Sequence, residues 1–213
     1  MDEQVSQYIE KMLPARNPFF LQLEQEAVED KVPIMDLTGI EVMLQYMRIQ
    51  QPKRILEIGA AIGYSGLRMA EALPNCEIIT IELDDDRYQQ AVNNIQAFGR
   101  EQQITVLKGN ALEVYDEVAK FGEYDAIFID AAKGQYQKFF ELYSPLLTEN
   151  GCVYTDNVMF RGFVAYDDIE NKRLRKLAEK INRYNEWMTS LKEYHTVIVP
   201  VGDGLAVSKK ING

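Results

Sequence analysis

The sequence contains little histidine and cysteine, which limits the kinds of site it can build. Its 213 residues include one histidine, His195, and two cysteines, Cys76 and Cys152. A site with several histidine ligands is therefore excluded, and the two distant cysteines form no metal-binding pattern. We expect both thiols to stay reduced, as the thiols of cytosolic proteins normally do.

Long apolar runs are also missing. No stretch approaches the roughly 18 apolar residues that a membrane span requires. The first four residues lack the basic and then apolar pattern that begins a signal peptide. These two absences predict a cytoplasmic protein with no membrane partner.

Positive charge is scarce relative to negative charge. The 33 Asp and Glu residues exceed the 23 Lys and Arg residues, and the net charge is -10. A chain of this charge does not carry the all-over basic surface of a general nucleic-acid-binding protein. A local basic patch remains compatible with it.

The overall composition is that of an ordinary globular protein, with 46% hydrophobic and 26% charged residues. The length suits one α/β domain with a well-buried core. No internal repeat, low-complexity tract or Gly/Ser-rich linker divides the chain. We therefore expect a single domain over residues 1–213, with a helical N-terminal cap over 1–50 and a Rossmann-like core over 51–213.

The spacing of apolar residues predicts helices in the N-terminal cap. Residues 2–13, 18–29 and 37–49 carry apolar side chains at three-to-four spacing, which is typical of amphipathic helices. Thr38 is the residue expected to cap the third helix.

After residue 51, short apolar strands alternate with helical segments. Strands are expected at 54–59, 77–82, 104–107, 124–130, 151–156, 196–200 and 205–208. This alternation predicts a Rossmann-like, mostly parallel sheet of seven strands with helices on both faces. Gly202-Asp203-Gly204 lies between the last two apolar runs and is a hairpin signal, so the last strand is expected to be antiparallel.

The end of the first strand has the glycine pattern of a cofactor loop. Glu57-Ile-Gly59 is followed by Gly63, whereas the dinucleotide fingerprint would need glycine at positions 61 and 64. Glu82 ends the next strand, where an acid can accept hydrogen bonds from ribose hydroxyls. The Glu57 carboxylate disfavours a pyrophosphate, so a cofactor with positive charge and no phosphate fits better. S-adenosylmethionine meets that description; the alternative is a glycine turn in an ordinary strand–helix unit.

Polar side chains also follow the fourth and fifth expected strands. Asp130 ends the fourth strand, and Asp156 and Asn157 end the fifth. Two carboxylates and an amide carbonyl at one sheet edge form a set of hard oxygen ligands suited to Mg²⁺. Lys133 lies three residues after Asp130, where it could take a proton from a hydroxyl. Taken singly, either aspartate could instead cap a helix.

Together these motifs resemble those of the Mg²⁺-dependent, catechol-type O-methyltransferases, a class I family that uses S-adenosylmethionine. The matching pieces are Glu57-Ile-Gly59-Ala-Ala-Ile-Gly63-Tyr64-Ser65, Glu82, Asp130-Ala-Ala-Lys133, Asp156-Asn157 and Asp203-Gly204-Leu205. The resemblance extends from about residue 32 to residue 208. Within the family, the chain is most similar to the bacterial enzymes that methylate 5-hydroxyuridine in tRNA.

The resemblance implies a role for each matching position. Asp130, Asp156 and Asn157 would bind the metal. Lys133 and Asp130 would be the catalytic residues, with Lys133 as the base. Glu82 would hold the ribose. The remaining positions implied to bind the cofactor are Met35, Glu57, Gly59, Gly63, Ser65, Ala111 and Asp130. The family often has an acid after the glycine of the third strand, where this chain has Asn110.

The resemblance also implies an acceptor and a partner. The acceptor would be the 5-hydroxyl of 5-hydroxyuridine at the wobble position of the tRNA anticodon loop, and the enzyme would be a homodimer. Residues 161–183 carry more basic than acidic residues, and Arg161 is the first candidate for a substrate contact. Two alternatives stay open: a small catechol-like or caffeoyl-type acceptor with the same metal and donor, and a nucleotide-binding protein without catalysis.

Overall fold

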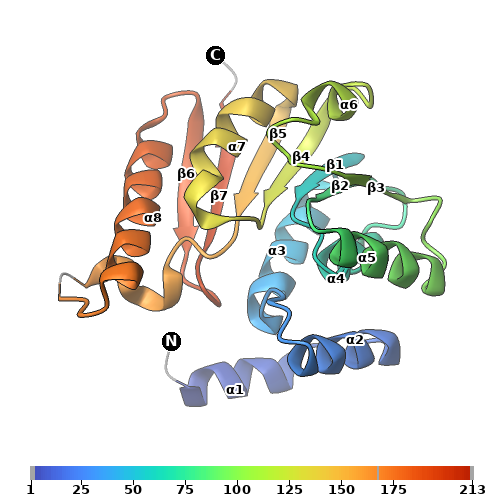
Figure 1. The fold of residues 1–213 in the computed structure, drawn as a ribbon, viewed down its shortest axis with the longest axis horizontal. Coiled ribbons are helices and arrows are strands. Elements are labelled where there is room, and N and C mark those ends of the chain that lie inside the picture. Colours follow the sequence, from blue (N-terminus) through green and yellow to red (C-terminus); the bar gives the residue numbers. More distant parts are fainter. Residues whose placement is uncertain (1–2, 167, 212–213) are drawn as a thin grey trace.

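A computed structural model describes residues 3–166 and 168–211. Its centre is a seven-stranded sheet in the order β3-β2-β1-β4-β5-β7-β6 (Figure 1). The strands are β1 Arg54–Ile58, β2 Glu77–Glu82, β3 Ile104–Lys108, β4 Tyr124–Ile129, β5 Leu147–Thr155, β6 Tyr194–Val199 and β7 Leu205–Lys210. Strand β7 runs antiparallel to β5 and β6, while β1 to β5 pair in parallel. The predicted fold class is confirmed.

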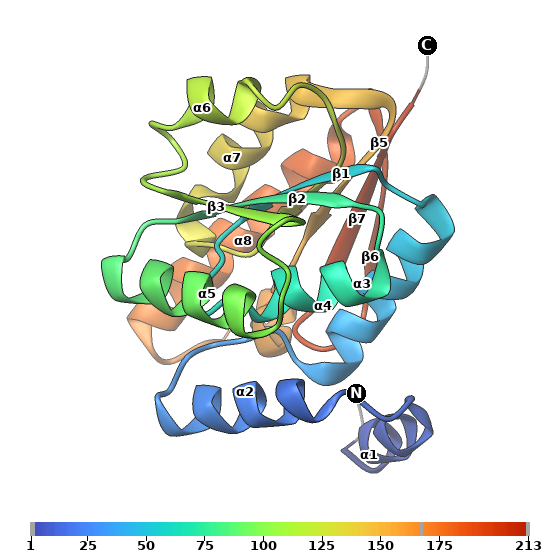
Figure 2. The same cartoon turned by 90° about the vertical axis from the view of Figure 1, so that its right-hand side faces the viewer.

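Helices cover both faces of this sheet, as Figure 2 shows. One layer holds α3 Leu37–Gln50, α4 Tyr64–Ala72 and α5 Asp85–Ala97, and the other holds α6 Tyr115–Ala119, α7 Tyr136–Tyr143 and α8 Lys172–Ser190. Three short 3-10 helices, η1 Lys133–Gln135, η2 Ser144–Leu146 and η3 Phe160–Ala165, lie in the connections. Successive strand residues point to opposite faces. Ile55 therefore packs with the first layer and Leu56 with the second.

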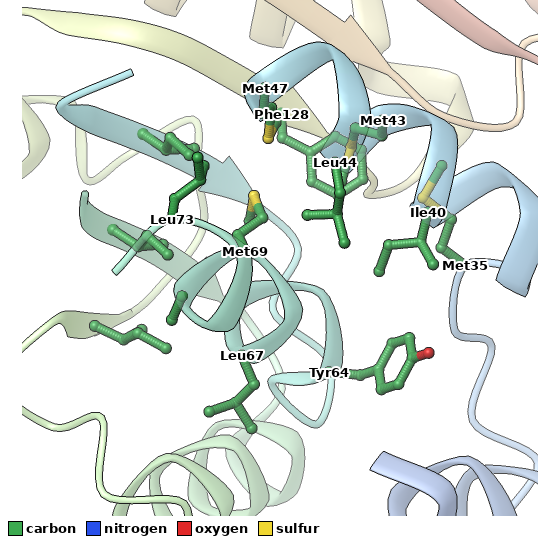
Figure 3. Packing of buried hydrophobic residues seen from close by; sticks show 14 of the residues in the cluster. Met35, Ile40, Met43, Leu44, Met47, Tyr64, Leu67, Met69, Leu73 and Phe128 are labelled. Carbon is green, nitrogen blue, oxygen red and sulfur yellow. The ribbon is translucent and has the colours of Figure 1, made fainter. Parts of the chain in front are cut away.

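The N-terminal helices α1 Glu3–Met12 and α2 Pro18–Glu29 form the lower edge of the molecule in Figures 1 and 2. Helix α2 buries Phe20 and Leu23 against the core. Helix α3 is held by apolar side chains that face α4, including Ile40 and Leu44 (Figure 3). Its N-cap is Asp36, whose Oδ1 accepts the Gly39 amide at 2.9 Å, so the expected cap at Thr38 was wrong.

Both cysteines are buried and unpaired, in agreement with the expectation of reduced thiols. Within residues 3–166 and 168–211, no helix combines the length and the apolar character needed to cross a bilayer.

Candidate active site

A cavity of about 1150 Å³ opens at the carboxyl ends of the parallel strands. Its walls include residues at the ends of β1, β2, β4 and β5, the segment 33–36 between α2 and α3, and Leu174 near the start of α8. Open α/β sheets bind their ligands at this edge. The sheet topology thus gathers the predicted residues from distant parts of the sequence.

The first position of the glycine loop after β1 has no room for a side chain. Gly59 has φ +106°, and a Cβ there would lie 2.1 Å from the carbonyl oxygen of Asp130. Only glycine therefore lets the ends of β1 and β4 lie so close together. Gly63 begins α4 in the left-handed region and does not line the cavity, whereas Ser65 does.

Glu82 holds this loop to the end of β2. Its Oε2 accepts the Ala61 amide at 2.8 Å, and its Oε1 accepts the Asp84 amide at 2.8 Å. The residue lines the cavity, as do Met35 and Ala111. Glu82 is thus fixed in orientation before any ligand binds.

Glu57 lies beneath the loop and does not line the cavity. It is fully buried and accepts a short hydrogen bond from the Ser65 hydroxyl. Removal from water raises the pKa of Glu57 to about 7, against the lowering effect of that hydrogen bond. Its direct role in this structure is therefore to orient Ser65 at the cavity wall.

Asp130, Asp156 and Asn157 converge at the ends of β4 and β5. The Asn157 Nδ2 donates to Asp156 Oδ2 at 2.5 Å and lies 3.4 Å from Asp130 Oδ1. Burial raises the pKa of Asp130 to about 6, although Lys133 acts in the opposite direction. Burial and then repulsion from Asp130 raise the pKa of Asp156 to about 8. The protein alone therefore supplies too little positive charge to balance the two carboxylates.

This donor set fits a divalent cation. A positive charge between the two carboxyls would offset the cost of burying them and their mutual repulsion. Carboxylate and amide oxygens are also the ligands that suit a hard cation. In the described part of the chain, no cluster of three His, Cys, Asp or Glu side chains could hold a metal ion. A metal ion here would be held by the two carboxyls and by the Asn157 amide, with its oxygen turned toward them.

Lys133 reaches the same group from the start of η1. Its Nζ donates to Asn157 Oδ1 at 2.6 Å and lies 3.5 Å from Asp203 Oδ2. The ammonium also lies 5.2 Å from the centre of the Phe160 ring. Lys133 lines the cavity, so a bound acceptor can approach its amine.

The loop after β5 is held in an unusual conformation by Asp203. Asn157, Phe160 and Arg161 all have positive φ, which is uncommon outside glycine. The Asp203 carboxylate accepts a short hydrogen bond from the Arg161 amide. The backbone carbonyl of Asp203 accepts a hydrogen bond from the Met159 amide at 2.8 Å. Arg161 is exposed and lines the cavity. The sequence predicted Arg161 as a site residue. It indicated Asp203 only as part of a hairpin signal and of a matching motif.

Comparison with known proteins identifies the family. The sequence profile of the O-methyltransferases matches residues 12–211, nearly the whole chain. The chain belongs to this O-methyltransferase family. It is therefore placed among the methyltransferases that depend on S-adenosylmethionine.

Individual relatives of this O-methyltransferase agree with the profile. Catechol O-methyltransferase of Niastella koreensis is 30% identical over 167 residues, which cover 76% of each chain. Caffeoyl-CoA O-methyltransferase of Populus kitakamiensis is 29% identical over 186 residues, covering 84% of this chain and 78% of its own. A crystal structure assigned to a caffeoyl-CoA O-methyltransferase of Staphylococcus aureus is 36% identical, with 98% of each chain covered and a TM-score of 0.89.

Proposed function

We propose that this O-methyltransferase transfers the methyl group of S-adenosylmethionine to the 5-hydroxyl of 5-hydroxyuridine at the wobble position of tRNA, giving 5-methoxyuridine. Mg²⁺ is the proposed metal. The observation that carries the RNA acceptor is a basic surface on α8, beside the mouth of the cavity.

The basic surface covers the face of α8 that points away from the core. Ala178, Ile181 and Met188 are buried on the inner face of the helix. The exposed basic residues on the outer face are Lys172, Arg173, Arg175, Lys176, Lys180 and Arg183. Among the described residues none of the six forms an ion pair, although the chain as a whole is acidic. Free cations on one helix face are the usual means of contacting phosphates.

The surface is continuous with the cavity. Leu174, within the basic stretch, lines the cavity, and the Lys180 ammonium approaches Gly134 in η1. A nucleotide inserted into the cavity would therefore leave its neighbouring phosphates near α8. A base in an anticodon loop is already unpaired, so extrusion costs little.

The residues of the site supply the steps of the proposed reaction. Glu82 would orient the ribose of the donor, while Gly59, Ser65 and Met35 would enclose its methionine end. Asp130, Asp156 and Asn157 would hold a divalent cation, whose chemistry when bound would be to make the acceptor hydroxyl more acidic. Lys133, after giving up a proton to solvent, would take the hydroxyl proton as a neutral amine. The acceptor oxygen would then attack the methyl carbon in line, and the sulfonium would leave as a neutral thioether.

A second candidate function is methylation of a small catechol-like or caffeoyl-type metabolite. The curated relatives support it, because they are named for catechol and caffeoyl-CoA and not for RNA. Coenzyme A also carries phosphates, so α8 could serve that acceptor as well. The basic surface thus favours a phosphate-bearing acceptor.

We also propose a homodimer, formed through the N-terminal helices. Helices α1 and α2 expose Tyr8, Met12 and Val28. Apolar side chains gathered on terminal helices suit an interface between subunits.

The deciding experiment is transfer of labelled methyl from S-adenosylmethionine, with Mg²⁺ or with EDTA. The acceptors are tRNA containing 5-hydroxyuridine, the same tRNA with uridine, catechol and caffeoyl-CoA. Label on the hydroxylated tRNA, with 5-methoxyuridine found by mass spectrometry and loss of the signal in EDTA, supports the proposal. Label on catechol or caffeoyl-CoA alone overturns the RNA acceptor and establishes the second candidate.

A further inference from the structure

The segment 33–36 forms one of the cavity walls that lie outside the sheet. Pro33, Ile34, Met35 and Asp36 all line the cavity, and they connect α2 to α3. Tyr64 and Ser65 at the start of α4 line the same cavity. The width of the cofactor site therefore depends on how α2 and α3 sit against α4.

One buried arginine, Arg68 of α4, joins these three helices. Its side chain is 3% exposed and donates a short hydrogen bond to Glu41 of α3. Its Nη1 lies 4.0 Å from Glu24 of α2 and donates to the Tyr64 hydroxyl at 2.8 Å. The Tyr64 hydroxyl in turn donates to Glu24 at 2.7 Å.

Aromatic rings complete the surroundings of Arg68. The guanidinium carbon lies 5.2 Å from the centre of the Phe20 ring of α2 and 5.6 Å from that of Tyr64. Figure 3 shows Tyr64 extending from α4 toward the N-terminal segment, on the side where Met35 and Ile40 lie. The two acidic partners and the two rings fix the position of the Arg68 guanidinium, because any shift would leave a buried charge without a partner.

We propose that Arg68 is a positioning residue for S-adenosylmethionine. It fixes α2 and α3 on α4, so that the segment 33–36 stands at the distance from Ser65 that the cofactor requires. Arg68 does not line the cavity and therefore acts through Met35 and its neighbours. This inference rests on the donor named in the proposed function.

Two variants test it. Arg68→Met with Glu41→Gln removes the tie to α3 without stranding a buried carboxylate, which would unfold many proteins. Glu41→Gln alone weakens the tie while Arg68 keeps Glu24. The control is Arg54→Gln, because Arg54 pairs with Glu77 at 2.6 Å at the amino ends of β1 and β2, and neither residue lines the cavity.

The readouts are equilibrium affinity for S-adenosylmethionine, steady-state kinetics and amide hydrogen exchange. In the double variant we expect affinity and KM for S-adenosylmethionine to worsen about tenfold, the loss of roughly one good interaction, with kcat within about twofold. Peptides covering residues 30–37 exchange faster, and those of β4 do not. Glu41→Gln shows the same changes to a smaller degree, and Arg54→Gln shows none.

The inference is overturned if the folded double variant binds S-adenosylmethionine as wild type does, or if kcat falls while affinity is kept. It is also overturned if exchange over residues 30–37 is unchanged. If the wild-type protein itself does not bind S-adenosylmethionine, the proposed function fails first. The two failures are therefore distinct.

Discussion

At the scale of single residues, Asp203 contacts more of the candidate active site than its place in the sequence motifs indicated. One carboxylate oxygen holds the Arg161 amide, and the other faces the Lys133 ammonium. The turn that carries it has no spare room, since a Cβ on Gly204 would lie 2.4 Å from Met159 Cγ. Asp203 therefore sets both the direction of Lys133 and the conformation of the loop after Asn157.

We expect Asp203→Asn to lower kcat by about 10- to 100-fold, the usual cost of losing a partner that orients a site residue. The amide can replace one acceptor oxygen but presents its NH2 to the second donor. KM for S-adenosylmethionine should stay within about twofold, because the Asp203 side chain contacts Arg161 and Lys133 and none of the residues proposed to hold the donor.

The matched control is Asp125→Asn at the other end of the sheet. Asp125 accepts the amides of Lys53 at 2.8 Å and Arg54 at 3.1 Å, so it too holds backbone. Steady-state kinetics and thermal unfolding of both variants separate the two roles. A wild-type kcat in Asp203→Asn, or an equal loss in Asp125→Asn, contradicts the assignment.

At the scale of elements, α8 divides its two faces between folding and binding. Neutralising the outer face should leave the fold intact, because the inner face carries the packing. We expect Arg173→Gln with Arg175→Gln and Lys176→Gln to raise KM for tRNA by about tenfold or more at low salt. The dependence of log KM on log salt should become shallower by roughly two, since fewer counterions are released. Affinity for S-adenosylmethionine should not change.

A variant of equal charge controls for net charge alone. Lys53, Lys120 and Lys192 are exposed and lie away from the carboxyl edge, so their replacement by Gln should leave KM for tRNA unchanged. Steady-state kinetics with tRNA at several salt concentrations measure both effects. Equal weakening in the two triple variants would reduce the α8 surface to an ordinary solvated helix face.

The same scale shows how far the sequence predicts the structure. The strands were predictable because parallel strands covered on both sides are continuous apolar runs, and their order places Asp130 beside Asp156. The short helix α6 was not predicted, since Tyr115–Ala119 is too brief for a periodic signal. The cap at Asp36 was missed because Asp36 and Thr38 are both capping residues, and tertiary packing selects between them.

The contacts among the site residues depend on backbone that periodicity does not encode. Lys133 meets Asn157, not Asp130, because η1 turns the chain after β4. The left-handed residues 160 and 161 depend on Asp203, which lies far along the chain. Proximity at a sheet edge was thus predictable, whereas the pairing of individual atoms required the fold.

At the scale of the whole molecule, the buried Glu57 makes stability depend on pH. Its folded-state pKa of about 7 exceeds its ordinary value of 4.5, so the folded protein holds a proton that the unfolded chain has already lost. Between these values the folded state binds more protons, and stability must fall as pH rises. Below pH 4.5 the residue contributes no pH dependence, and above about 7 the loss is complete.

We expect Glu57→Gln to remove this part of the pH dependence. Gln keeps an acceptor oxygen for the Ser65 hydroxyl and carries no charge into the interior. Relative to wild type, the variant should gain stability from pH 5 to pH 8 by an amount on the order of 3 kcal/mol at the upper end. Urea unfolding across that range, without cofactor or metal, measures the difference curve, with the exposed Glu101→Gln as control.

The difference curve reports Glu57 together with its repulsion from Asp130 and Glu82, which also raises the pKa of Glu57. A gain that grows with pH shows that the molecule bears the cost of a buried acid beneath its cofactor loop. A flat difference would mean that Glu57 ionises as freely inside the fold as in water, and the assigned effect of burial would be wrong. In the first case Glu57 is retained at a cost in stability, which is the expected mark of a residue that serves ligand binding through Ser65.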